Sequence, residues 1–199
     1  MTHMNERLLK QIEFIKEIDK LKSIFRKSYL LDRSRYENDA EHTWHLTVMA
    51  ILLQEYANER NLNLLRVLKM LIIHDIVEID AGDTFAYDAK GNEDKFERES
   101  QAARRIFGLL PEDQQHEMNQ LWVEYEQRQT PEAQFASALD RLQPLLHNYV
   151  TEGKSWQENG ITSDKVLARI RGIREGSAEL GKLAETIVRS AVEKGYLSK

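Results

Sequence analysis

The chain has 199 residues, no cysteine and a formal net charge of −5, with 41% hydrophobic and 31% charged residues. This length suffices for one well-buried core, and the composition is typical of a soluble globular protein. The acidic balance argues against a broad nucleic-acid interface, and the lack of cysteine excludes disulfides, thiolate zinc sites and cysteine nucleophiles. No apolar run approaches the roughly 20 residues of a membrane span, and no signal peptide is recognisable. We therefore expect a cytoplasmic protein that binds neither nucleic acid nor membrane.

Hydrophobic spacing predicts an all-α fold in a single domain over residues 1–199, with only three prolines and nine glycines to interrupt the helices. In chain order, the expected helices cover residues 5–23, 41–59, 64–76, 95–108, 111–128, 131–150, 163–175 and 178–194. Asn38 or Asp39 is the expected N-cap of the second helix. The intervening segments have no helical period and are expected to be loops, chiefly 24–40, 81–94 and 151–161. The C-terminal helices, 163–194, are expected to pack either on the rest of the chain or on a partner subunit.

Four side chains able to bind a metal lie at the edges of apolar helix faces. The second helix carries His42 in its first turn, the third ends with the adjacent pair His74 and Asp75, and the helix over 131–150 carries Asp140. A carboxylate at the edge of a core needs a partner, because burying an unpaired charge is costly. A divalent cation or a buried ion pair between His and Asp would each meet that need. Two imidazoles and two carboxylates suit Mn, Fe, Co, Ni or Zn, and Mg less well.

The order and spacing of these residues resemble the HD-domain phosphohydrolase superfamily. Two segments are similar to its 5′-deoxynucleotidase-like branch, namely 38–42 (NDAEH) and 74–83 (HDIVEIDAGD), and both are followed by the distant Asp140. The resemblance spans roughly residues 8–150. A lone His-Asp pair would be a weak signal, but Glu78 and the Gly82-Asp83 pair also stand at matching offsets.

The resemblance implies an HD-domain helical bundle with one divalent metal ion between core helices, held by His42, His74, Asp75 and Asp140. Glu78 and Asp83 would be catalytic groups around the attacking water and the leaving oxygen, and Arg26 would bind the substrate phosphate. The implied reaction is hydrolysis of a small phosphomonoester, such as a (deoxy)nucleoside 5′-monophosphate, by attack of metal-bound water. The implied partners are a small phosphorylated nucleotide as substrate and a second copy of the chain in a homodimer.

Several points stay open in the sequence. Lys27 follows Arg26 where the resembled branch has a tryptophan that helps to exclude a ribose 2′-hydroxyl, so a preference for deoxyribose is undecided. His45, one helical turn from His42, is either a group behind the metal ligand or an ordinary packed histidine. His147 is expected to be a surface residue or core filler.

The aromatic residues Phe85 and Tyr87, in the loop over 81–94, could stack on a substrate or dock on the core. Two other functions are also compatible with the chain. One is a catalytically silent module that binds a metal and a nucleotide, and the other is a purely structural helical domain.

Overall fold

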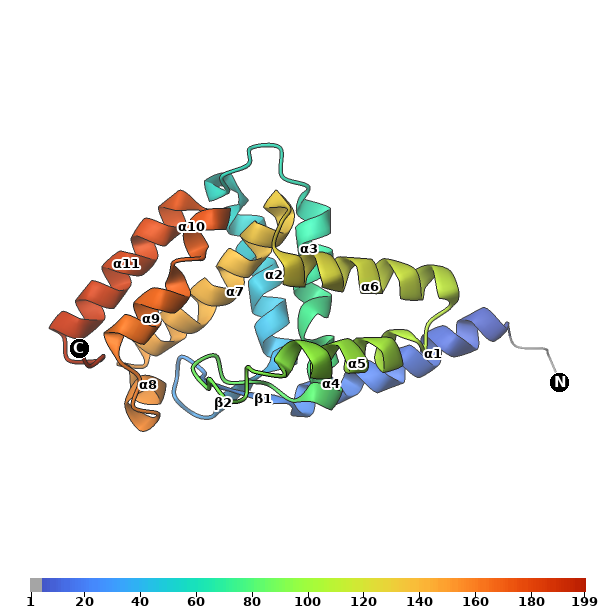
Figure 1. Cartoon of the computed structure of the whole chain (residues 1–199), viewed down its shortest axis with the longest axis horizontal. Helices are drawn as coiled ribbons and strands as arrows, with labels where there is room; N and C mark the ends of the chain where they lie inside the picture. Colours follow the sequence, from blue (N-terminus) through green and yellow to red (C-terminus); the bar gives the residue numbers. More distant parts are fainter. Residues whose placement is uncertain (1–4) are drawn as a thin grey trace.

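The computed structural model describes residues 5–199, and this part of the chain is built mostly of helices (Figure 1). The α-helices are α1 Glu6–Ile18, α2 Asp39–Leu53, α3 Leu64–Ile73, α4 Glu78–Ala81, α5 Lys95–Phe107, α6 Glu112–Gln127, α7 Pro131–Val150, α8 Lys154–Glu158, α9 Ser163–Ile170, α10 Ile173–Gly176 and α11 Ala178–Glu193. Three 3₁₀ segments adjoin them, η1 Asp19–Ser23, η2 Gln54–Tyr56 and η3 His74–Val77. Helices are present in every predicted region, but the helix predicted over 163–175 is divided into α9 and α10. The prediction of a helical bundle is confirmed.

The segment 24–40, predicted as a loop, instead forms an antiparallel hairpin of strands β1 Phe25–Tyr29 and β2 Tyr36–Asn38. The inward-facing side chains of these strands are polar, since Ser28 and Glu37 are buried whereas Phe25 is exposed. A search for alternating apolar residues therefore cannot find them. The hairpin brings Arg26 and Glu37 next to the helices that carry the predicted metal ligands.

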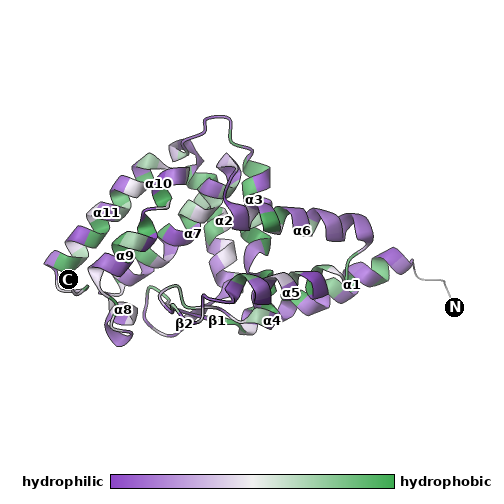
Figure 2. Ribbon diagram, viewed as in Figure 1, coloured by the Kyte–Doolittle hydropathy of each residue, from purple (hydrophilic) through white to green (hydrophobic). Residues whose placement is uncertain are grey.

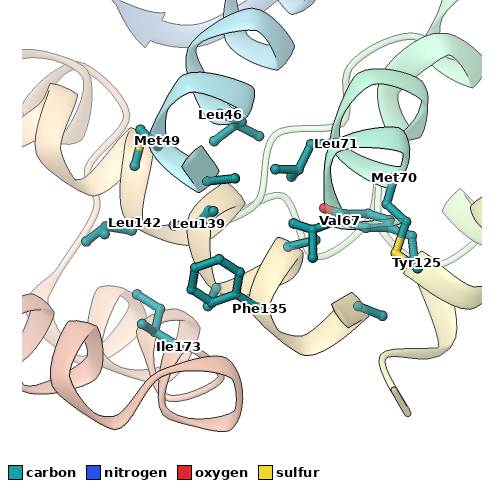
Figure 3. Packing of buried hydrophobic residues seen from close by; sticks show 14 of the residues in the cluster. Leu46, Met49, Val67, Met70, Leu71, Tyr125, Phe135, Leu139, Leu142 and Ile173 are labelled. Atoms are coloured by element: carbon teal, nitrogen blue, oxygen red, sulfur yellow. The ribbon is translucent and has the colours of Figure 1, made fainter. Parts of the chain in front are cut away.

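The helices α2, α3 and α7 pack on one another at the centre of the bundle (Figure 1). Figure 3 shows their buried apolar side chains meeting those of α6 and α10, among them Leu46, Met49, Val67, Met70, Leu71, Tyr125, Phe135, Leu139, Leu142 and Ile173. The N-cap of α2 is Asn38, one of the two predicted residues. Its side chain accepts a hydrogen bond from the Glu41 N–H, and the Glu41 carboxylate accepts one from the Asn38 N–H. This capping box fixes the first turn of α2, where His42 lies.

The third predicted helix ends earlier than expected. α3 stops at Ile73, and the chain tightens into η3, a change that is common at helix ends. All four residues of η3 are buried, so His74 and Asp75 lie inside the molecule. α4 follows and ends at Gly82, whose φ of 75° is unfavourable for residues with a Cβ atom. After this turn Asp83 lines the same pocket as His74.

The C-terminal helices α9, α10 and α11 pack on α7 of the same chain (Figure 1). Leu180, Ile187 and Val188 of α11 are buried there, whereas Leu183 is exposed. The segment 151–161, predicted as a loop, contains the short helix α8, which begins after Gly153 in a left-handed conformation.

Exposed apolar side chains gather on three helices, at Leu8, Leu9, Ile12 and Ile15 of α1, Trp44, Val48, Ile51 and Leu52 of α2, and Leu65 and Ile72 of α3. Figure 2 shows how hydrophobic and hydrophilic residues alternate along the helices of the bundle. None of the helices within residues 5–199 combines the length and the apolar character needed to cross a membrane.

Candidate metal centre

The four predicted ligands come together from α2, η3 and α7. One ligand atom each of His42, His74 and Asp75 lies within 4.8 Å of the other two, and all three residues are buried. Asp140 Oδ1 lies 3.0 Å from His42 Nε2 and 3.9 Å from His74 Nε2. Two imidazoles and two carboxylates, separated by up to 98 residues in the sequence, thus surround one point.

The hydrogen bonding of His74 leaves one ring nitrogen free. Its Nδ1 lies 2.9 Å from the carbonyl oxygen of Leu71, and because a carbonyl only accepts, Nδ1 must carry a proton. In the neutral imidazole Nε2 then has a lone pair. This nitrogen is buried without a hydrogen-bond partner and lies 3.0 Å from Asp75 Oδ1. A lone pair that faces a carboxylate oxygen needs a cation or a proton between them, so a metal fits the site.

His42 is held in the same way by a buried amide. Its Nδ1 lies 3.1 Å from Gln143 Oε1, which accepts the proton and leaves Nε2 turned toward Asp140. Burial of His42 opposes its protonated form, yet the carboxylates of Asp140 and Glu37 outweigh burial and raise its pKa to about 9. For Asp140, burial alone would raise the pKa, but the hydrogen bond with His42 and the nearby imidazole of His74 hold it well below its usual range.

Carboxylates outnumber cations at this site. Burial and the charge of Asp75 raise the pKa of Asp39 to about 7. Burial, followed by the charges of Asp75 and Asp39, raises the pKa of Glu78 well above its usual range. The pKa of Asp83 is also raised by burial, against the charge of Arg26. Such a surplus of buried negative charge favours a divalent cation, because its attraction to several carboxylates would offset the free-energy cost of their desolvation.

Arg26 is the cation that lies closest to these carboxylates. Its Nη1 is 3.0 Å from Asp75 Oδ2 and 3.3 Å from Asp39 Oδ1, and its Nη2 is 3.9 Å from Asp140 Oδ1. Its side chain is only 11% exposed, yet it lines the pocket beside His74 and Glu78. The predicted phosphate-binding residue is therefore next to the predicted ligands, where it is paired with carboxylates.

A buried polar network lies behind His42, and sequence analysis did not anticipate it. Gln143 Nε2 donates to Glu37 Oε1 at 2.7 Å and lies 3.0 Å from His147 Nε2 and 3.3 Å from His45 Nδ1. His147 Nδ1 in turn donates to the Tyr29 carbonyl oxygen at 2.9 Å. His147 was expected to be a surface residue or core filler, but it is a buried member of this network. Its Nδ1 contacts β1 and its Nε2 contacts Gln143 on α7.

The group of Glu37, His45 and His147 also has ligand atoms within 4.8 Å of one another. The amide nitrogen of Gln143 already lies among all three, and its two N–H groups are placed to donate to Glu37 and His147, the nearest two, without a metal. In the sequence, the one signal for a role of Gln143 was its spacing, because a residue three positions after Asp140 lies on the same face of the helix.

A pocket of about 300 Å³ opens onto the metal-binding groups, and His74, Asp75, Glu78, Asp83 and Asp140 line one end of it. This volume is at the lower end of the range for small-molecule sites, roughly 300–1,000 Å³. Aromatic side chains of the loop over 81–94 and of α8 line another part, namely Phe85, Tyr87 and Trp156. Phe85 and Tyr87 pack against the core and also against each other edge to face, with ring centroids 5.3 Å apart. The two alternatives predicted for them therefore do not exclude each other, because both residues dock on the core and both line the pocket.

Comparisons with known proteins identify the family of the chain. A family model described as HD domain matches residues 18–180. The 5′-deoxynucleotidases HDDC2 of Homo sapiens and Bos taurus are 31% and 30% identical over 136 residues, which is 68% of this chain and 65% and 64% of those proteins. The chain thus spans less than two thirds of the length of these curated relatives. The crystal structure of a predicted metal-dependent phosphohydrolase from Magnetospirillum magnetotacticum is 55% identical, with a TM-score of 0.92 over 97% of this chain and 96% of that one.

Proposed function

Because the chain belongs to the HD-domain family of metal-dependent phosphohydrolases, we propose that it hydrolyses a small phosphomonoester, most simply a nucleoside 5′-monophosphate. The observation that supports this most is the meeting of His42, His74, Asp75 and Asp140 beside a pocket of suitable size, which the last three of them line. The relatives named as 5′-deoxynucleotidases support the choice of a nucleotide.

These four residues would hold one divalent ion. When bound, such an ion acidifies water and neutralises charge on phosphoryl oxygens. The orphaned Nε2 of His74 and the carboxylate surplus around it support this assignment. Leu71 and Gln143 fix the two imidazoles so that their Nε2 atoms face the site, as hydrogen-bond partners commonly do behind metal-binding histidines.

Arg26 binds the phosphate of the substrate. A guanidinium suits this task because its planar donors match two phosphate oxygens. In the absence of an ion, Arg26 balances the charges of Asp75 and Asp39. A cation would take over this balance and leave the donors of Arg26 available. Glu78 and Asp83, which line the pocket but are not needed as ligands, move protons at the attacking water and at the leaving oxygen.

Lys27, at the position that distinguishes this chain from the resembled branch, is exposed and lines the pocket. An ammonium tolerates a neighbouring hydroxyl and attracts phosphate, so we propose that ribose and deoxyribose substrates are both accepted. The aromatic side chains of Phe85, Tyr87 and Trp156 supply apolar surface for the base.

We also propose that the chain forms a homodimer through the exposed apolar side chains of α1, α2 and α3. Large exposed apolar surfaces are unusual on soluble monomers, and a two-fold axis would pair this surface with an identical one. The apolar stripe of α11 is mostly occupied by packing within the chain.

The test is phosphate release from ribo- and deoxynucleoside 5′-monophosphates by protein stripped with EDTA and then supplied with Mn or Co. Release is expected only with an added ion, and not from a His74→Ala variant. The matched control is His116→Ala, because His116 is an exposed histidine on α6 that is not part of the site. If the ion binds but no member of the panel releases phosphate, the chain is instead a silent binding module. If no ion binds, the metal assignment is wrong.

A further inference from the structure

Three arginines that are not among the proposed ligands also line the pocket, and the proposed function assigns them no role. Arg128 directly follows α6, Arg141 lies in α7 and Arg169 lies in α9. Three separate helices thus direct guanidinium groups to one pocket. Arg141 and Arg169 also line an adjoining hollow together with Lys165, so positive charge continues toward the mouth.

Within the described residues, none of these arginines forms an ion pair with a carboxylate. Within residues 5–199, no carboxylate lies within 4.0 Å of Arg128, Arg141 or Arg169, and none of the three side chains forms a hydrogen bond. Glu126 lines the same pocket but is not paired with them. By contrast, many arginines on the surface form ion pairs, for example Arg7, Arg66, Arg105 and Arg174.

The three groups are held near one another despite their like charges. Arg141 is half-buried, and it lines both the pocket and the adjoining hollow together with Arg169. The guanidinium of Arg141 lies against Gly172, where an added Cβ would come within 1.3 Å of its Nη1. Arg128 has a left-handed backbone (φ 53°), a conformation that usually favours glycine. An arginine at such a position costs conformational energy, so its side chain has a use there.

We propose that Arg128, Arg141 and Arg169 form a second anion-binding site, and that the preferred substrate carries a second phosphate or carboxylate besides the phosphomonoester that is cleaved. Guanidinium groups bind both anions through paired N–H donors, and a bound anion would relieve the repulsion among the three. The site is part of a pocket and so selects small molecules. This inference rests on the proposed function for the first phosphate, but the anion site itself is testable without turnover.

The first experiment titrates inorganic phosphate into the full-length protein in EDTA by calorimetry, so that the metal-binding groups do not contribute. One phosphate per chain is expected to bind to the wild type, with at least tenfold weaker binding in Arg141→Met and Arg169→Met. A Gly172→Ala variant, which displaces the Arg141 guanidinium without changing the charge, is expected to weaken binding as well. The matched control is Arg189→Met, because Arg189 is an exposed arginine on α11. Equal affinity in all these proteins, or no binding to the wild type, would overturn the proposal.

The second experiment compares kcat/KM for adenosine 5′-monophosphate, adenosine 3′,5′-bisphosphate and 3-phosphoglycerate with the metal-loaded enzyme. The wild type is expected to prefer at least one substrate with a second anion by tenfold or more. The two added substrates distinguish phosphate from carboxylate. This preference should fall at least tenfold in Arg141→Met and stay unchanged in Arg189→Met. If phosphate binds in EDTA but no substrate is cleaved, the proposed function fails and the anion site stands. If the monophosphate is cleaved but phosphate binding in EDTA does not depend on the arginines, the anion site fails and the proposed function stands.

Discussion

Replacing Gln143 by methionine tests whether the buried network behind His42 positions the metal centre. The amide of Gln143 contacts His42 Nδ1 at 3.1 Å, Glu37 Oε1 at 2.7 Å and His147 Nε2 at 3.0 Å. Methionine is similar in length and apolar, so it fills the space but leaves all three buried groups unsatisfied. Each such group costs about 1–2 kcal/mol when the structure relaxes in part, so the three together cost roughly 3–6 kcal/mol.

This loss is large against the roughly 5–15 kcal/mol by which domains are stable, so Gln143→Met should unfold at clearly lower urea concentration in EDTA. The variant no longer fixes the orientation of the His42 ring. Its affinity for Mn²⁺, measured by calorimetry, should therefore fall by roughly 10- to 100-fold, as is usual when a partner behind a metal ligand is removed.

The matched control is Gln134→Met on the same helix, because the Gln134 side chain is half-buried and forms no hydrogen bond within residues 5–199. It should change the free energy of unfolding by no more than about 0.5 kcal/mol and leave the metal affinity unchanged. If Gln143→Met behaved like Gln134→Met in both measurements, the network would have no part in positioning His42.

Three further predictions concern other parts of the molecule. Asp75→Ala should lose both the bound metal, measured by elemental analysis, and phosphate release. Glu78→Ala should keep the metal and lose turnover. Full activity of Asp75→Ala would contradict a single metal site. Burial raises the pKa of Glu99 from 4.5 to about 7, so the folded chain holds a proton that the unfolded chain releases in that window. The contribution of Glu99 to the free energy of unfolding should therefore fall as pH rises through the window, by up to about 3 kcal/mol. Glu99→Gln should make the overall slope shallower by that amount, while the slope due to Asp39 and Glu78 remains; an unchanged slope would show that Glu99 ionises normally. Ile51→Glu should convert a dimer to monomers in light scattering, and a wild type that is already monomeric would refute the proposed interface.

The sequence was most informative where function and packing impose the same pattern. Helical periods predicted the bundle, and Asn38 was one of two predicted capping residues. The proposed ligands His42, His74, Asp75 and Asp140 stood out as metal-competent residues at helix edges, and the family resemblance implied the complete set. These residues sit on or beside regular helices, so their position along the chain fixes the direction in which they point.

Other features depend on contacts that no local pattern encodes. The strand β2 buries Glu37, a residue that hydropathy assigns to the surface, because Gln143 and His42 lie opposite it. Likewise, nothing near Arg128, Arg141 or Arg169 in the sequence indicates that these three residues line one pocket. Such convergence is decided by the packing of distant elements.

The central claim is that four side chains from separate elements bind one cation beside the pocket. Its most direct test is anomalous diffraction from crystals of the protein soaked in Mn²⁺. The account predicts one strong peak per chain in contact with His42, His74, Asp75 and Asp140. No peak there, or a peak among Glu37, His45 and His147 instead, would contradict it.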